Sequence, residues 1–144
     1  MFNKILFPID LTDEASWQRS LPIVTRMALD YGAELHVVSV LPDFGLSMVG
    51  GFFKEGFEKE ALKQLGDQLR EWVGAQIPPA VNVKPHVLHG SIYAEIMRAA
   101  DRLNVDVIVI GAHRPEFSDY LLGPNAARVV RHAKQSVFVV RDDS

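Results

Sequence analysis

Five short apolar segments recur along the sequence, and a segment with helical periodicity separates each one from the next. The apolar segments are 4–9, 34–41, 81–88, 105–110 and 136–141, and the helical patterns cover 13–31, 57–73, 91–104 and 124–133. Strict alternation of strand and helix implies a parallel sheet, because helical crossovers join parallel neighbours. The sequence therefore predicts an α/β fold of three layers, with helices on both faces of a five-stranded parallel sheet.

Several residues mark the expected ends of these elements. Thr12 is the expected N-cap of the first helix, and Gly32 follows its end. Pro22 falls inside this helix, where a proline removes a hydrogen bond or causes a kink. Pro85 favours an edge position for the third strand, because proline cannot donate to the ladder. Ser91 is the expected N-cap of the helix that follows.

Size and composition limit the classes of function. A chain of 144 residues is long enough for one domain with its own core, so residues 1–144 are expected to form a single domain. The net charge of −3 argues against a nucleic-acid partner, and the absence of cysteine excludes disulfides and thiolate chemistry. No apolar segment approaches the roughly 18–20 residues of a membrane span, and no signal peptide is evident. We expect a cytoplasmic protein without membrane insertion.

A candidate site lies where the first and fourth strands end. If these strands are neighbours in the sheet, a ligand is expected beyond their carboxyl ends, where the strand order reverses. The first strand ends in Pro8-Ile9-Asp10, and the fourth ends in Gly111-Ala112-His113-Arg114. The Asp10 carboxylate either accepts hydrogen bonds from a ribose or binds nearby loop amides, and both interpretations remain open. Gly111 is expected to allow close approach of the backbone to a ligand.

The start of the last helix is the candidate anion site. Gly123 precedes this helix, and the free N–H groups of a helix start bind anions. Pro124 suits the first helical position but offers neither an N–H nor a hydroxyl, which leaves the amides of Gly123, Asn125 and Ala126 and the Asn125 side chain. Arg114 either contacts a phosphate or is a solvated surface arginine. The spacing is neither a Walker A loop nor a dinucleotide fingerprint.

The other polar residues favour structural roles. His86 and His89 are three apart on a strand, so their side chains point to opposite faces and are poorly placed to share a metal ion. No Ser-His-Asp arrangement with a nucleophile elbow is present. We therefore expect no metal site of the protein's own and no catalytic residues.

The sequence resembles the universal stress protein family over nearly its whole length. The resemblance rests on KILFPIDLTDEA, VVSVLPD, VLHGSIYAEI, VDVIVIGAHR and LLGPNAARVVRHAKQSVFVVR. Nucleotide-binding members carry G-x2-G-x9-G-[ST] after the fourth strand, whereas this chain has Gly111-x2-Arg114-x8-Gly123-Pro124. An arginine-proline pair at this place is similar to the UspF-like branch of small bacterial members, although serine is expected there in place of Pro124.

The resemblance implies a Rossmann-like nucleotide-binding fold with strand order 3-2-1-4-5 and a site for ATP, ADP or AMP, with Mg²⁺ accompanying the phosphates. Asp10 would hold the ribose. The residues implied around the adenine and the phosphates are Pro8, Ile9, Val40, Gly90, Gly111, His113, Arg114, Gly123, Pro124 and Asn125. Pro124 lacks the hydroxyl and the amide N–H that serine would offer to a phosphate. If nothing replaced these two groups, the free energy of nucleotide binding would be weaker by about 1–3 kcal/mol.

The resemblance also implies a homodimer through the terminal strand 136–141, whose apolar edge needs a partner. The leading hypothesis is an ATP-binding regulatory protein of the stress response with little or no catalysis. Two alternatives remain open: a nucleotide-free dimer that regulates a partner protein, and a slow ATPase.

Overall fold

The computed structural model describes residues 1–42, 54–112 and 124–141, and within them five parallel strands form one sheet. The strands are β1 (Lys4–Pro8), β2 (Glu34–Pro42), β3 (Asn82–Gly90), β4 (Val107–Ala112) and β5 (Ser136–Arg141). Their spatial order is β3-β2-β1-β4-β5, and every neighbouring pair is parallel. The predicted fold class and strand order are confirmed.

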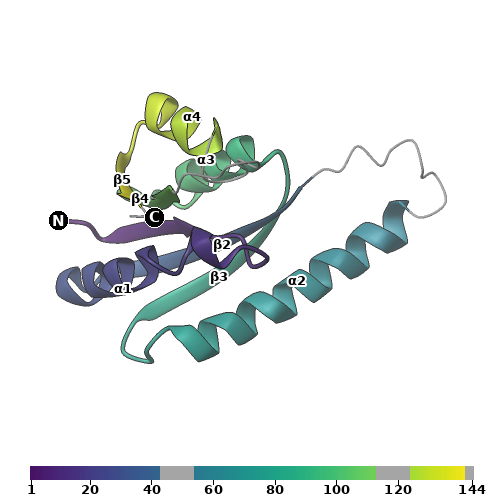
Figure 1. The fold of residues 1–144 in the computed structure, drawn as a ribbon, viewed down its shortest axis with the longest axis horizontal. Coiled ribbons are helices and arrows are strands. Elements are labelled where there is room, and N and C mark those ends of the chain that lie inside the picture. The colour runs from purple at the N-terminus through teal and green to yellow at the C-terminus, as the bar shows by residue number, and fades with distance from the viewer. Residues whose placement is uncertain (43–53, 113–123, 142–144) are drawn as a thin grey trace.

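Helices cover both faces of the sheet (Figure 1). Helices α1 (Ser20–Tyr31) and α2 (Lys54–Gln76) lie on one face, and α3 (Ile92–Arg102) and α4 (Pro124–His132) lie on the other. Successive side chains of a strand alternate between these faces. On β2, Val37 packs with the α1 and α2 core, whereas Val38 packs with the α3 and α4 core. None of the helices within the described ranges is long and apolar enough to cross a membrane.

Burial follows position in the sheet. Ile5, Leu6 and Phe7 of the central strand β1 are fully buried, as expected for a parallel strand covered on both faces. Edge strand β5 differs, because Phe138 keeps 44% of its surface exposed. The other edge is β3, which carries Pro85, so the edge position predicted from this proline is confirmed.

The first helix begins later than predicted. A short 3-10 helix, η1 (Glu14–Ser16), comes before α1, and the Asp13 side chain accepts its capping hydrogen bond from the Ala15 amide at 3.1 Å. Thr12 is not the N-cap, because its hydroxyl donates to the Asp10 carboxylate instead. The helix predicted over 13–31 is therefore wrong at its start and right at its end, where Gly32 adopts a left-handed φ of 60°.

Pro22 is the third residue of α1, which changes its expected effect. The first four N–H groups of a helix have no partner inside the helix, so a proline at this place removes no helical hydrogen bond. The predicted loss of a bond is therefore wrong, because it rested on a helix predicted to begin at residue 13 rather than at Ser20.

Strands β3 and β4 extend two residues beyond the predicted ends at 88 and 110. Gly90 and Gly111 consequently lie within these strands rather than after them. Gly90 pairs with Pro42 of β2, and Gly111 pairs with Val140 of β5. Ser91 does occupy the N-cap position of α3, with extended backbone angles of −69° and 129°, but its side chain makes no capping hydrogen bond.

Candidate functional site

The carboxyl ends of β1 and β4 meet at the point where the strand order reverses. The two strands are neighbours, through the pairs Ile5–Val107 and Leu6–Ile108. The chain leaves β1 for α1 on one face and leaves β4 for α4 on the opposite face (Figure 1). Ligands of such sheets bind at this edge, because the two crossovers depart in opposite directions there.

Asp10 follows β1 at this edge and is held by a compact turn. Its Oδ1 atom accepts hydrogen bonds from the Thr12 amide at 2.9 Å and from the Thr12 hydroxyl at 2.7 Å. Among the described residues, its Oδ2 atom accepts no hydrogen bond. The carboxylate is half-buried. It therefore does bind a loop amide, as one interpretation expected, and it keeps a second oxygen that a ligand hydroxyl can use.

Ser16 fixes the backbone of Asp10. The Ser16 Oγ atom accepts from the Asp10 amide at 2.9 Å and donates to the Asp10 carbonyl at 3.1 Å. Ser16 is fully buried, so both backbone groups of Asp10 are satisfied without water. The direction of the carboxylate is thus set by η1, which lies six residues further along the chain.

Glycine is required at position 111 by a contact that the sequence did not predict. A Cβ atom built on Gly111 would lie 2.8 Å from the Ser16 carbonyl oxygen, closer than such atoms can approach. The backbone of η1 therefore packs directly on β4 at this point. Close approach of the backbone was predicted for Gly111, but the partner that the structure shows is η1 rather than a ligand.

Pro8 and Ile9 form the buried approach to Asp10. Pro8 ends β1, and Ile9 continues the ladder through its amide, which donates to the Val38 carbonyl at 2.9 Å. Ile9 is 3% exposed. Both residues shape the edge of the sheet beside Asp10, and their side chains offer only apolar contact.

Val40 and Gly90 come from the neighbouring strands. Val40 is half-buried on β2 and pairs with Leu88. Gly90 ends β3 with a φ of 136°, and a Cβ atom there would lie 3.3 Å from the Glu95 side chain. Glycine at this position is therefore required by the backbone conformation, whatever the site binds.

The phosphate half of the predicted site is only partly described. His113, Arg114 and Gly123 lie outside the described residues. Pro124 is the first residue of α4, as predicted for a proline before a helix, and Asn125 follows it half-buried in the first turn. The structure thus brings Pro8, Ile9 and Asp10 together beside Gly111 and leaves their relation to the His113–Gly123 loop as a prediction.

Thr12 and Ser16 contribute to the site but were not predicted to do so. Thr12 was assigned to a helix cap, and Ser16 was treated as part of a helix. The sequence did carry a signal, because an Asp followed two residues later by a Thr favours an Asx turn. Within the described ranges, no group of three His, Asp or Glu side chains could hold a metal ion.

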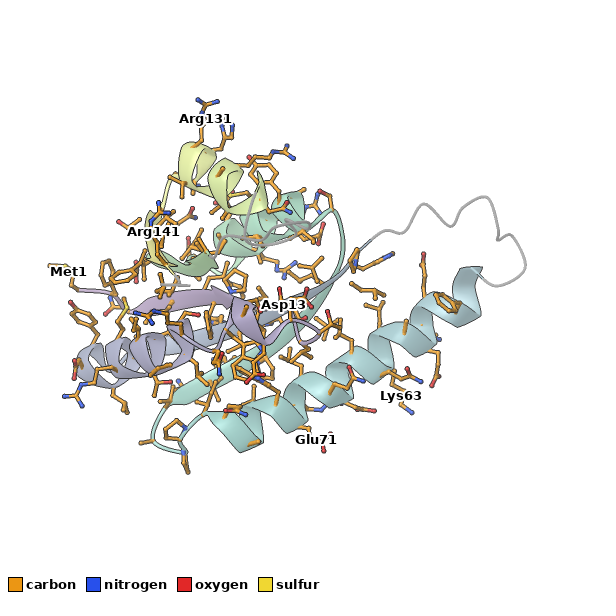
Figure 2. The ribbon with its side chains drawn as sticks, in the orientation of Figure 1. Met1, Asp13, Lys63, Glu71, Arg131 and Arg141 are labelled. Carbon is orange, nitrogen blue, oxygen red and sulfur yellow. The ribbon has the colours of Figure 1, made fainter. Side chains whose placement is uncertain are left out.

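A separate hollow runs along α4 and β5. Its volume is about 990 Å³, and its lining includes Val130 and Val139 together with Arg128, Arg131 and Arg141. Arg131 projects outward from α4, and Arg141 lies at the end of β5 (Figure 2). Its lining does not include Asp10 or Gly90, but it does include Ala126, whose amide is one of the predicted anion donors.

Comparison with known proteins defines the class. The model of the universal stress protein family matches residues 1–141. Universal stress protein G of Shigella flexneri is 32% identical over 147 aligned residues, which cover 98% of this chain and 100% of that protein. The chain therefore belongs to the universal stress protein family.

Two similar solved structures carry adenine nucleotides. One is a universal stress protein in complex with cAMP, 17% identical, with a TM-score of 0.60 and 97% coverage of both chains. The other is the universal stress protein of Archaeoglobus fulgidus in complex with dAMP, 22% identical, with a TM-score of 0.55 and coverage of 96% of this chain and 97% of that one. At these identities the likeness shows a shared fold.

Proposed function

We propose that this protein binds an adenine nucleotide, with ATP as the leading candidate, at the carboxyl edge of β1 and β4. The observation that carries the proposal is Asp10, which stands at this edge with one carboxylate oxygen bound by Thr12 and the other without a hydrogen bond among the described residues. A sugar hydroxyl of a nucleotide supplies the hydrogen bond that such an oxygen accepts. The cAMP and dAMP complexes of proteins with this fold support the choice of an adenine nucleotide.

The proposed pocket divides into three parts. Pro8, Ile9 and Val40 contact the adenine, with Gly90 at its border, and Asp10 holds the ribose. The phosphates lie towards the start of α4, where the groups proposed to bind them are Gly111, His113, Arg114, Gly123, Pro124 and Asn125. Mg²⁺ accompanies the phosphates rather than occupying a site of the protein's own.

The proposed role is regulatory, with little or no turnover, in a stress response in the cytoplasm. Hydrolysis requires a base that activates water, and the Asp10 oxygen nearest to the turn is already occupied by two donors from Thr12. Nucleotide occupancy would instead report adenylate levels to a protein partner.

The test of the ribose contact is Asp10→Asn. The asparagine oxygen still accepts from Thr12, so the turn is kept, but the charge that strengthens a hydrogen bond from a ribose hydroxyl is lost. A charge-assisted hydrogen bond contributes about 1.5–3 kcal/mol, so we expect roughly a 10- to 100-fold weaker affinity for ATP in calorimetric titration. Glu14→Gln, an exposed neighbouring carboxylate in η1, is the matched control and should leave the affinity unchanged. Equal affinities of Asp10→Asn and the native protein would remove Asp10 from the site.

Exposed apolar side chains on β5 and α4 support a second candidate function, a protein-interaction dimer. Phe138 on β5 and Val130 on α4 are 44% and 51% exposed, and Val130 lines the hollow described above. An exposed apolar edge strand needs a cover, and pairing with β5 of a second copy provides one. The protein would then act as a homodimer through residues 136–141 that engages a regulatory partner without needing a nucleotide.

A further inference from the structure

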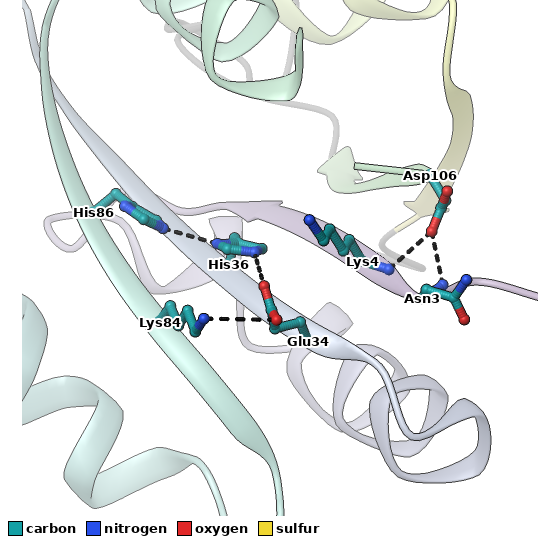
Figure 3. Close-up of polar contacts among 7 residues, drawn as sticks. All are labelled: Asn3, Lys4, Glu34, His36, Lys84, His86 and Asp106. Carbon is teal, nitrogen blue, oxygen red and sulfur yellow. Dashed lines mark hydrogen bonds and ion pairs between the residues drawn. The ribbon is translucent and has the colours of Figure 1, made fainter. Parts of the chain in front are cut away.

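Three ionisable side chains form a hydrogen-bonded chain across β2 and β3. The His36 Nε2 atom lies 2.7 Å from Glu34 Oε1, and the His36 Nδ1 atom lies 2.8 Å from His86 Nε2 (Figure 3). His36 is 3% exposed, in a sheet whose other strand residues at this depth are mostly apolar. The two imidazole planes are inclined by only 23°, with ring centres 5.1 Å apart. Because the nitrogens are much closer than the ring centres, the rings meet edge to edge through their nitrogens.

This arrangement fixes where protons can be. An ionised carboxylate only accepts, so the His36 Nε2 atom carries a hydrogen and donates to Glu34. The contact between His36 Nδ1 and His86 Nε2 then needs one hydrogen between two nitrogens. With both rings neutral, His86 donates to His36. With one added proton, a single N–H still lies between the rings, and the bond is kept.

A second added proton cannot be accommodated. Both facing nitrogens would then carry a hydrogen, and two cationic rings would stand in contact inside the sheet. His36 is enclosed, whereas His86 is half-buried on the edge strand β3. His86 is therefore the ring that can leave the contact and reach water.

The surrounding charges oppose that second proton. Lys4 comes from β1, Lys84 from β3 and Arg102 from α3, and all three act on Glu34 or His86. Burial, and then the charges of His36, Arg102 and Lys84, lower the pKa of His86 below its usual 6.5. The hydrogen bond from His36, more than the nearby lysines, lowers the pKa of Glu34 below 4.5, so the carboxylate that anchors the chain stays ionised in mild acid.

We propose that the chain Glu34–His36–His86 is an acid-sensitive switch, which holds one proton within the sheet and opens at His86 when a second proton binds. The part that responds is the edge formed by β3 and the adjoining helix α3, while β1, β4 and β5 stay in place. The switch requires no ligand, so its test is independent of nucleotide binding.

The direction of the pH effect follows from linkage. A histidine whose pKa is lower in the folded state binds protons more readily when unfolded, so the folded state loses stability as the pH falls through 6.5 towards the folded pKa. Glu34 adds a second loss only at lower pH, because its stabilising charge persists above 4.5. The switch therefore acts in mild acid, before general acid unfolding.

The first experiment observes the shared hydrogen directly. In protein labelled with ¹⁵N on histidine, nuclear magnetic resonance at pH 7.5 should show scalar coupling between the ring nitrogens of His36 and His86 across the hydrogen bond. At pH 5 this coupling should be lost while the folded spectrum remains. Absence of the coupling at pH 7.5, or its persistence at pH 5, would overturn the proposal.

The second experiment compares melting temperatures at pH 7.5 and 5.5 for the native protein, His86→Gln and His89→Gln. Glutamine at 86 can donate to His36 but cannot ionise. We expect the acid-induced fall in melting temperature to be smaller in His86→Gln by roughly 2–4 °C. His89 lies on the opposite face, 3.9 Å from Glu58, and its variant should retain the native fall. The same fall in all three proteins would show that His86 is not the acid-sensitive group.

Discussion

At the scale of single residues, the contact between Gly111 and η1 controls how Asp10 is presented. A methyl group at 111 would stand 2.8 Å from the Ser16 carbonyl, and backbone cannot swing aside as a flexible side chain can. We predict that Gly111→Ala lowers the free energy of unfolding by about 1–3 kcal/mol, as overpacking commonly does. It should also weaken nucleotide binding, because η1 carries the serine that fixes the Asp10 backbone. Chemical denaturation measures the first effect.

Gly74 provides the matched control for this substitution. It lies within α2, and a Cβ atom there meets nothing within 4 Å. Gly74→Ala should therefore stabilise the protein by about 0.5–1 kcal/mol, because alanine loses less backbone freedom in a helix. If Gly111→Ala were equally stabilising, the close contact between β4 and η1 would be refuted.

At the scale of elements, the terminal strand β5 is an edge of the sheet and the proposed dimer interface. Phe138 is exposed on this strand, and the proposed homodimer buries it against its own copy. We predict that Phe138→Glu converts a dimer into a monomer, because two facing carboxylates would replace two aromatic rings at the interface. Light scattering after size-exclusion chromatography at micromolar concentration measures the mass.

Phe57 is an equally exposed aromatic residue, at 53%, and it lies on α2, a helix that packs against β2 and β3 rather than β5. Phe57→Glu should leave the mass unchanged, which separates loss of a specific interface from a general effect of charge. A native protein that elutes as a monomer would contradict pairing through β5.

The elements show why sequence reasoning succeeded for strands and failed at one helix start. Apolar runs such as 105–110 predict buried strands because a parallel strand is covered on both faces. Hydrophobic periodicity could not separate η1 from α1, because Leu11 and Trp17, on either side of η1, pack against the same core as α1. The deciding contact is the hydrogen bonding of Thr12 to Asp10, a local competition that helix propensity does not describe.

At the scale of the whole molecule, alternation of strands and helices predicted the fold class, and resemblance to the family predicted the strand order. The position of Asp10 at the switch point also followed from the sequence. The role of Gly111 did not, because its neighbour Ser16 is 95 positions away in the chain and their contact exists only in the fold. The pairing of His36 with His86 was missed for the same reason, since it requires the register of β2 and β3.

The central claim is that the protein binds an adenine nucleotide. Calorimetric titration of the native protein with ATP and Mg²⁺, after removal of any nucleotide retained on purification, tests it most directly. We predict saturable binding of one nucleotide per chain, with a matching rise in melting temperature that grows with nucleotide concentration, because a ligand that binds only the folded state stabilises it. Neither heat of binding nor a rise in melting temperature at millimolar ATP, ADP, AMP or cAMP would contradict the claim.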